Sequence, residues 1–236
     1  MKKYLLLLLP VFVLCLGSCK KDPVDYTGYT SSVNPNNPST GTPTTNPNAN
    51  DSYLPITTGS SWTYESDLTG VVQSSEAHIT GVITTINGQN YYEVKSATPG
   101  NENALQYYYV KDKKYKIMAT TVREKVTVEF FILDDNLKVG DEWTATMSPD
   151  GLVNGVPGRT VSKIIESGIT KTVRNKTYTN VIHTHMIVQY NYGLGNGFED
   201  SGTYDYYLAK GVGLIQTDAE LFGFKSSSYL SKYTIR

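Results

Sequence analysis

The sequence is poor in cysteine, with only Cys15 and Cys19 among 236 residues, both near its start. The rest of the chain therefore offers no thiol for a disulfide, a zinc site or nucleophilic catalysis. Excess charge of one sign is also lacking, because 21 Lys and Arg face 22 Asp and Glu. This balance excludes a nucleic-acid binder that relies on bulk positive charge. Only one stretch is continuously apolar, which excludes several membrane spans.

That apolar stretch has the order of a secretory signal. Lys2 and Lys3 precede twelve residues, 5–16, that are interrupted only by Pro10 and are too few to span a membrane. The following order, Leu16-Gly17-Ser18-Cys19, resembles the lipobox of bacterial lipoproteins. The resemblance implies that residues 1–18 are removed and that Cys19 is acylated, with palmitate as one chain. An ordinary secretory cleavage site before a cysteine is the alternative.

The residues after Cys19 bear on the destination of the protein. Lys20-Lys21-Asp22 follow it, and no Asp stands directly after the cysteine. By resemblance to lipoprotein sorting rules, this order favours the outer membrane, on its periplasmic face or at the cell surface. Removal of Lys2 and Lys3 leaves 19 basic against 22 acidic residues. We therefore expect lipid, and not basic residues, to hold the mature protein at the membrane.

Residues 19–52 are predicted to be a tether. In 31–50, four Pro, six Asn, seven Ser or Thr and one Gly fill eighteen of twenty positions. Such a composition buries too little apolar surface to offset the entropy of ordering. The segment is therefore expected to hold the following domain away from the bilayer.

Residues 53–236 are predicted to form an all-β domain. In 122–132 the apolar residues fall mainly on even positions and the charged ones on odd positions, and 177–192 alternates in the same way. No window after Cys19 shows a convincing 3.6-residue period. Short runs separated by turn residues leave no room for crossover helices, so the sheet should be antiparallel. We expect ten to twelve strands in a curved sheet or partly closed β-barrel, with Asn87-Gly88, Asp112-Lys113 and Asn175-Lys176 as hairpin turns.

The only two tryptophans have matching contexts, Gly59-Ser60-Ser61-Trp62-Thr63 and Gly140-Asp141-Glu142-Trp143-Thr144. A turn glycine followed by a tryptophan that opens a strand predicts two core anchors at a sheet end. Two alternatives remain. The pair could mark a duplicated half-domain, or Trp62, Trp143 and Tyr108 could form aromatic platforms for a glycan.

Three blocks carry a further resemblance: 137–144, 176–185 and 206–218, the last reading YYLAKGVGLIQTD. They are similar to blocks of a family of Gram-negative lipoproteins of unknown function (TapB-like). Their domain is similar to the half-barrel sheets of periplasmic lipoprotein carriers. The resemblance implies a fold and a location but brings no catalytic residue.

Candidates for chemistry are sparse. His183 and His185, two apart on a predicted strand, point to the same side, as metal-binding pairs do, although a solvated face is the better explanation. The acidic pairs Asp134-Asp135, Asp141-Glu142 and Glu199-Asp200 sit in predicted turns. There is no Gly-x-Ser-x-Gly and no remaining cysteine. We therefore expect no catalytic residue and no cofactor, and we do not expect an enzyme.

These observations predict a non-enzymatic, outer-membrane-anchored lipoprotein whose β-domain binds an apolar or lipid-like ligand in its curved sheet. One alternative is a glycan-binding surface lipoprotein that uses exposed Trp and Tyr side chains. Another is a structural subunit of an envelope assembly with a protein partner.

Overall fold

The computed structural model describes residues 49–68, 70–98, 101–120 and 126–236, so Cys19 and most of the tether lie outside the described residues. After a short 3₁₀ helix, η1 (Ala49–Asp51), every regular element is a strand: β1 (Ser61–Leu68), β2 (Val71–Ile86), β3 (Gln89–Thr98), β4 (Asn101–Lys111), β5 (Lys114–Thr120), β6 (Thr127–Asp134), β7 (Glu142–Thr146), β8 (Leu152–Val153), β9 (Val156–Val173), β10 (Lys176–Tyr190), β11 (Glu199–Ala209), β12 (Gly213–Leu221) and β13 (Phe224–Thr234). The predicted all-β class is confirmed. None of the described helices has the length and apolarity to span a membrane.

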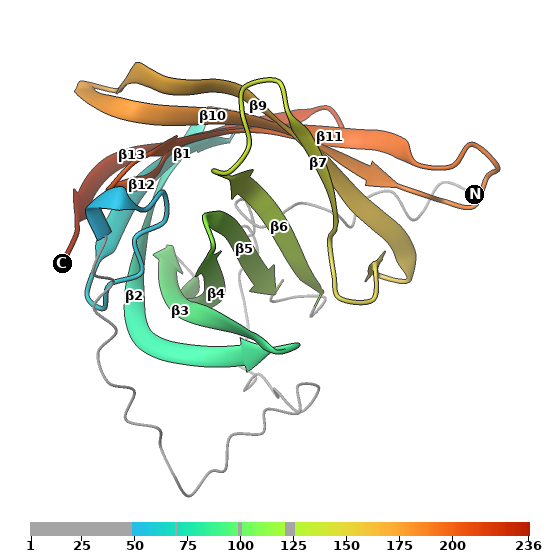
Figure 1. The fold of residues 1–236 in the computed structure, drawn as a ribbon, viewed down its shortest axis with the longest axis horizontal. Coiled ribbons are helices and arrows are strands. Elements are labelled where there is room, and N and C mark those ends of the chain that lie inside the picture. The colour runs from blue at the N-terminus through green and yellow to red at the C-terminus, as the bar shows by residue number, and fades with distance from the viewer. Residues whose placement is uncertain (1–48, 69, 99–100, 121–125) are drawn as a thin grey trace, which may run out of the picture.

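All the strand pairs are antiparallel, and twelve strands follow one path in the order β6-β5-β4-β3-β2-β1-β13-β12-β11-β10-β9-β7, with β8 paired to β9. The sheet curls until its two edge strands, β6 and β7, approach each other (Figure 1). One backbone bond, from Glu129 N–H to the Met147 carbonyl at 2.8 Å, joins the β6 edge to the chain that follows β7. The result is a nearly closed barrel, as the sequence predicted.

Two of the predicted hairpin turns are confirmed and one is shifted. Asn87 and Gly88, and likewise Asp112 and Lys113, have the positive φ angles of two-residue hairpin turns. The third turn was predicted at Asn175-Lys176, but Lys176 pairs with Val173, so the turn is Arg174-Asn175. The register of β10 against β9 decides this, and the local sequence does not.

The chain enters the domain at the β11–β12 turn, which defines the proximal end of the barrel. The Gly211 N–H donates to the Ser52 carbonyl at 2.8 Å, and Lys210 pairs with Asp51 at 2.7 Å. A hydrogen bond from Lys210 lowers the pKa of Asp51. Asp51 and Ser52, predicted to belong to the tether, therefore pair with the folded domain.

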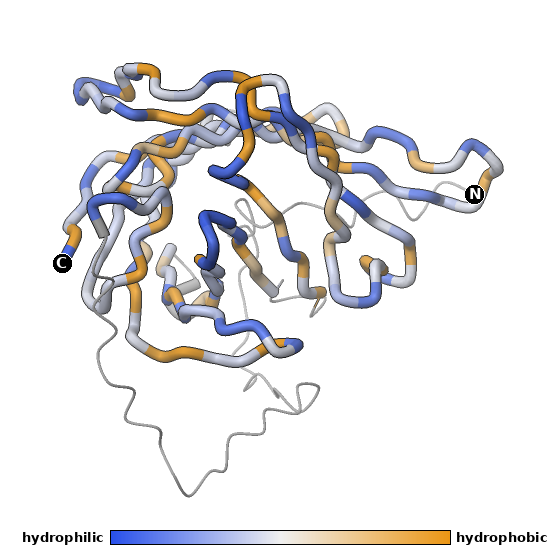
Figure 2. The backbone as a smooth tube through the Cα atoms, viewed as in Figure 1, coloured by the Kyte–Doolittle hydropathy of each residue, from blue (hydrophilic) through white to orange (hydrophobic). Residues whose placement is uncertain are grey.

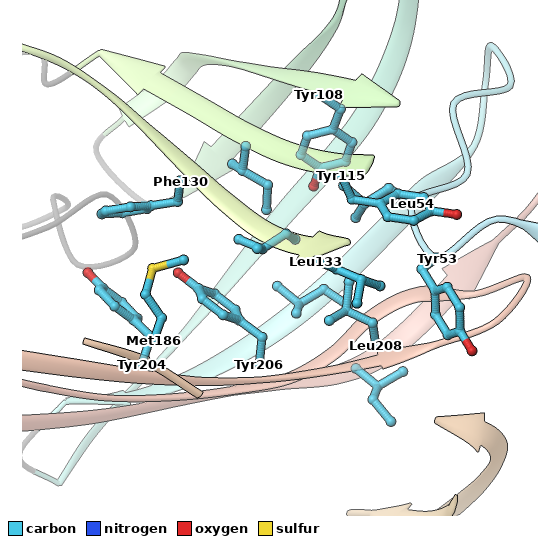
Figure 3. Close-up of a cluster of buried hydrophobic side chains, with 14 of the residues drawn as sticks. Tyr53, Leu54, Tyr108, Tyr115, Phe130, Leu133, Met186, Tyr204, Tyr206 and Leu208 are labelled. Carbon is cyan, nitrogen blue, oxygen red and sulfur yellow. The ribbon is translucent and has the colours of Figure 1, made fainter. Parts of the chain in front are cut away.

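Side chains from all around the curl fill its interior. Tyr53 and Leu54 enter it from the proximal end, and Phe130 and Leu133 of β6 meet Tyr204 and Tyr206 of β11 (Figure 3). Apolar residues alternate with polar ones along most strands, as Figure 2 shows, because successive side chains of a strand point to opposite faces. The inward set forms one continuous core.

The two glycine–tryptophan corners are structurally equivalent. The Gly59 N–H bonds to the Ile79 carbonyl at 3.1 Å, and the Gly140 N–H bonds to the Ile164 carbonyl at 2.9 Å. The bonds around them match too: Ile79 N–H to Ser60 O, Ile164 N–H to Asp141 O, Ser60 N–H to Thr57 O and Asp141 N–H to Lys138 O. Each corner opens a run of successive antiparallel strands. This arrangement supports the duplicated half-domain that the sequence left open.

Candidate functional site

On one side of the barrel, the inner face differs between the two ends. At the proximal end it carries large apolar side chains from β1, β2 and β4, among them Trp62, Tyr64, Ile79 and Tyr108. Further along the same strands, toward the distal end, the inward positions become small and polar. We define the distal end by the β1–β2 and β12–β13 hairpin turns and the 191–198 loop, which lie opposite the turn where the chain enters.

Eight inward residues on neighbouring strands form what we call the polar inner stretch. They are Ser66 of β1, Gln73 and Ser75 of β2, Ser96 of β3, Gln106 of β4, Thr217 of β12, and Ser226 and Ser228 of β13. The register sets them side by side, since Ser228 pairs with both Thr217 and Ser66, and Ser66 pairs with Gln73. Most are half-buried, and none is charged. Hydroxyl and amide groups of this kind donate and accept hydrogen bonds without favouring a charged ligand.

Two buried hydroxyls at this site have no partner among the described residues. Thr217 is 3% exposed and Tyr204 is 2% exposed, and neither side-chain oxygen makes a hydrogen bond there. Tyr204 stacks on Tyr206 with ring centroids 5.4 Å apart. Burial raises the pKa of Tyr204 well above its usual value, so the phenol keeps its proton and can donate. A buried polar group without a partner lowers stability, and such groups mark places where a ligand can supply the missing bond.

Exposed apolar side chains line part of this end. We call them the apolar rim: Val71 and Val72 beside the β1–β2 turn, Tyr192 and Leu194 in the 191–198 loop, and Phe222 and Phe224 at the β12–β13 turn. Phe224 pairs with the buried Leu221, so it extends the inner face outward. Aromatic side chains next to hydroxyls and amides are the groups that bind sugar rings, by stacking and by hydrogen bonding.

The aromatic residues singled out in the sequence lie elsewhere. Trp62 is 2% exposed and Tyr108 is 4% exposed, with ring centroids 6.5 Å apart, so neither presents a face to a glycan. The Trp62 Nε1–H donates to the Val212 carbonyl at 2.7 Å. Trp143 is half-buried, and its Nε1–H donates to the Phe131 carbonyl at 3.1 Å. All three side chains anchor the barrel.

His183 and His185 share the outer face of β10, as their spacing predicted. Both bind one carboxylate oxygen of Asp205, at 2.8 Å and 3.0 Å, and His183 also lies 3.3 Å from Glu166. Burial favours a higher pKa for Asp205, but the two histidine hydrogen bonds outweigh it and lower the pKa. No group of three or more His, Cys, Asp or Glu side chains in the described part of the chain is arranged to hold a metal ion.

The outer-face tyrosines are occupied by structural contacts. His183 stacks on Tyr207 at 4.2 Å, and the Lys171 ammonium lies 3.6 Å from the centroid of the same ring. The Arg174 guanidinium lies 4.7 Å from the ring of Tyr229. These contacts fasten the β9–β10 hairpin to the neighbouring strands.

The acidic pairs are engaged within the chain. Asp134 accepts from Asn136, Asp141 accepts from the Lys138 N–H, and Glu142 pairs with Lys163 at 3.0 Å. In the third pair, Glu199 accepts from Asn196 and Asp200 accepts from Gln189. These contacts fix turns and strand ends, and none of them forms a recognisable catalytic arrangement.

Sequence reasoning missed the polar inner stretch. The signal was present, because Ser66 follows the apolar inward positions of β1, and Gln73 and Ser75 precede those of β2, at two-residue spacing. Serine is common on solvated faces, so only strand register shows that these side chains point inward.

Comparisons with known proteins give a fold likeness and no family. No model of a known protein family matches the chain, and no curated protein matches it. A solved structure assigned as a lipoprotein of Parabacteroides distasonis is similar, with 12% identity and a TM-score of 0.47 over 78% of this chain and 99% of that one. A second, assigned as an exported Bacteroides fragilis protein with a YmcC-like fold, has 9% identity and a TM-score of 0.46 over 77% and 98%. Neither is a TapB-like protein by description, so that resemblance stays a prediction.

Proposed function

We propose that this protein is a non-enzymatic, lipid-anchored envelope protein whose barrel binds an uncharged glycan at its distal end. The observation that carries the proposal is the polar inner stretch, which includes the buried hydroxyl of Thr217, without a partner among the residues that the structure describes. A neutral sugar offers many hydroxyls that both donate and accept, and this matches a surface of serine, threonine and glutamine without charge. Anchoring through Cys19 at the outer membrane rests on the sequence alone.

The apolar ligand expected from the sequence is the second candidate. It is favoured by exposed Val71 and Phe224 at the apolar rim. Against it, the apolar part of the inner face is occupied by the chain's own core, and on β1 to β4, β12 and β13 the part toward the distal end is polar. An apolar ligand would therefore have to displace buried side chains or cover hydroxyls without pairing them, which lowers its affinity.

Two measurements separate the candidates. Native mass spectrometry of the full chain purified from its own envelope should show adducts of hexose mass if the ligand is a glycan, and of fatty-acid mass if it is apolar. Titration with a panel of neutral oligosaccharides should then show binding that Ser75→Ala weakens several-fold. Ser74→Ala is the matched control, because Ser74 is the preceding residue of β2 and points outward. Equal binding by both variants, or no oligosaccharide binding at all, would refute the glycan proposal.

A further inference from the structure

The apolar rim contains a strained residue at the β12–β13 hairpin. Phe222 has φ of 51° at the two-residue β12–β13 turn and is exposed. The other described non-glycine residues with positive φ are Asn, Asp, Lys or Arg. A bulky aromatic side chain is disfavoured in this conformation and is unfavourable in water, so Phe222 is stabilised at this position by neither local preference nor solvation. Such an outlier points to a role outside the folded domain.

The 191–198 loop presents Leu194 to solvent. Leu194 is 77% exposed and lies between Gly193 and Gly195, both of positive φ. A Cβ added at either glycine would meet no atom within 4 Å, so the backbone around Leu194 is uncovered. The loop therefore holds a large aliphatic side chain away from the barrel.

Two of the three parts of the rim, the β1–β2 and β12–β13 hairpins, end at about the same height along the barrel axis. Ser226 pairs with Leu68 at the β1–β2 hairpin, and Phe224 lies two residues further out on β13. Neighbouring strands are about 4.8 Å apart, so hairpins two strands apart are separated by about 10 Å. Barrel strands tilt by about 35–45°, and over that separation the tilt amounts to about 7–10 Å along the strand, or two to three residues. The observed offset of two residues therefore brings the tips of these two hairpins to about the same height. The 191–198 loop extends further outward, beyond the ends of β10 and β11.

Charges near the rim are mainly acidic. Among the described residues there, Asp67, Glu199, Asp200 and Glu220 outnumber the basic ones, and Lys225 is already paired with Glu220 at 3.3 Å. Arg159 lies over the ring of Phe198 at 4.1 Å. Anionic surfaces are therefore not attracted to this end, whereas a zwitterionic surface is not repelled.

We propose that the apolar rim docks on a zwitterionic lipid bilayer, with Phe222, Phe224 and Leu194 inserted at the interface. Two hairpin tips at one height, with a longer loop beside them, can enter a lipid surface together, and aromatic side chains favour the interface between head groups and acyl chains. Docking places the polar inner stretch against the head groups. If the barrel binds a glycan as proposed, this glycan is the uncharged sugar head group of a lipid. This last step rests on the proposed function.

The docking is tested with the full, lipid-anchored chain in phosphatidylcholine vesicles that carry brominated acyl chains. Phe222→Trp and Leu194→Trp place a reporter at the rim, and Asn175→Trp places one at the exposed β9–β10 turn near the proximal end. The emission of the unsubstituted chain, with Trp62 and Trp143, is subtracted. We expect quenching at least twofold stronger at the two rim positions than at Asn175→Trp, since all three variants share the same anchor.

Equal quenching at all three positions, or no quenching at the rim, would overturn the docking. An increase when one third of the lipid is replaced by phosphatidylglycerol would do the same, because it would indicate attraction by charge. A second arm adds digalactosyl diacylglycerol to the vesicles, and stronger rim quenching that Ser75→Ala abolishes supports the head-group ligand. Binding of free oligosaccharides without rim quenching would leave the proposed function standing and reject the docking alone.

Discussion

The indole Nε1–H of Trp143 donates to the backbone carbonyl of Phe131 at 3.1 Å, across the line where the two sheet edges meet. The rings of the two residues lie 5.7 Å apart. β1 is the strand of the other half that corresponds to β7, and it pairs with β13 through the main chain along eight register positions. Between β6 and β7 a side-chain donor thus replaces a bond of the main-chain ladder, and this contact helps to close the barrel.

Substitution of Trp143 by Phe should therefore loosen this closure. We expect a loss of about 1 kcal/mol in the free energy of unfolding, the net value of one hydrogen bond. Amide exchange of Glu129 should also become faster. Trp62→Phe is the comparison, and it should destabilise more, by about 2–3 kcal/mol, because a buried carbonyl loses its donor and the core loses volume. Unchanged exchange in β6 of Trp143→Phe would contradict this account of the closure.

Removal of the Tyr204 hydroxyl should stabilise the protein. That oxygen is buried without a partner among the described residues, so Tyr204→Phe should raise the free energy of unfolding by about 1 kcal/mol. Tyr64→Phe is the matched control and should lower the free energy of unfolding, since the Tyr64 hydroxyl donates to the Leu214 carbonyl at 3.1 Å. Chemical denaturation measures both. If Tyr204→Phe proves as destabilising as Tyr64→Phe, the hydroxyl has a partner in the folded protein.

Stability should fall in acid because of Asp205. Hydrogen bonds from His183 and His185 hold its pKa below the usual 3.8 in the folded chain, so the folded state favours the ionised carboxylate. This contribution is fully present above the unfolded pKa, near 4, and is lost as the pH falls through the lower folded value. In Asp205→Asn the decline in the free energy of unfolding below about pH 4 should be shallower. If the free energies of unfolding of the unsubstituted chain and of Asp205→Asn fall in parallel below about pH 4, Asp205 does not cause the loss of stability in acid.

The anchor predicts a change in cell fractionation. Cys19→Ser should move the protein from the membrane fraction to the soluble fraction after washing, because docking by a few apolar tips is reversible, whereas several acyl chains anchor stably. Ser18→Ala is the control, since a small residue before the cysteine keeps the cleavage signal. If Cys19→Ser pellets with membranes as the unsubstituted chain does, Cys19 is not the anchor.

Much of the fold could be predicted from local patterns. Alternation placed Val128, Phe130 and Ile132 inward, and Asn87-Gly88 marked its hairpin, because side-chain period and turn conformation depend on neighbouring residues. The matched glycine–tryptophan contexts predicted two equivalent corners. Alternation does not predict which residues point inward after a β-bulge, because the extra residue shifts the pattern. Two-residue alternation alone would put Tyr229 and Tyr233 on one face. The register shift opposite Thr63 and Tyr64 instead leaves Tyr229 outside, beneath Arg174, and sets Tyr233 opposite the inward Trp62.

The sequence by itself determined the class of the domain, its strands and turns, and the predicted Cys19 anchor, all of which follow from local chemistry. Only the tertiary structure decided which polar residues face inward. Ser66, Gln73 and Ser228 are far apart or unremarkable in the chain, and cross-strand register alone brings them together. The same holds for Phe222 and Leu194, which share one end of the barrel because antiparallel strands return their turns to the same edge.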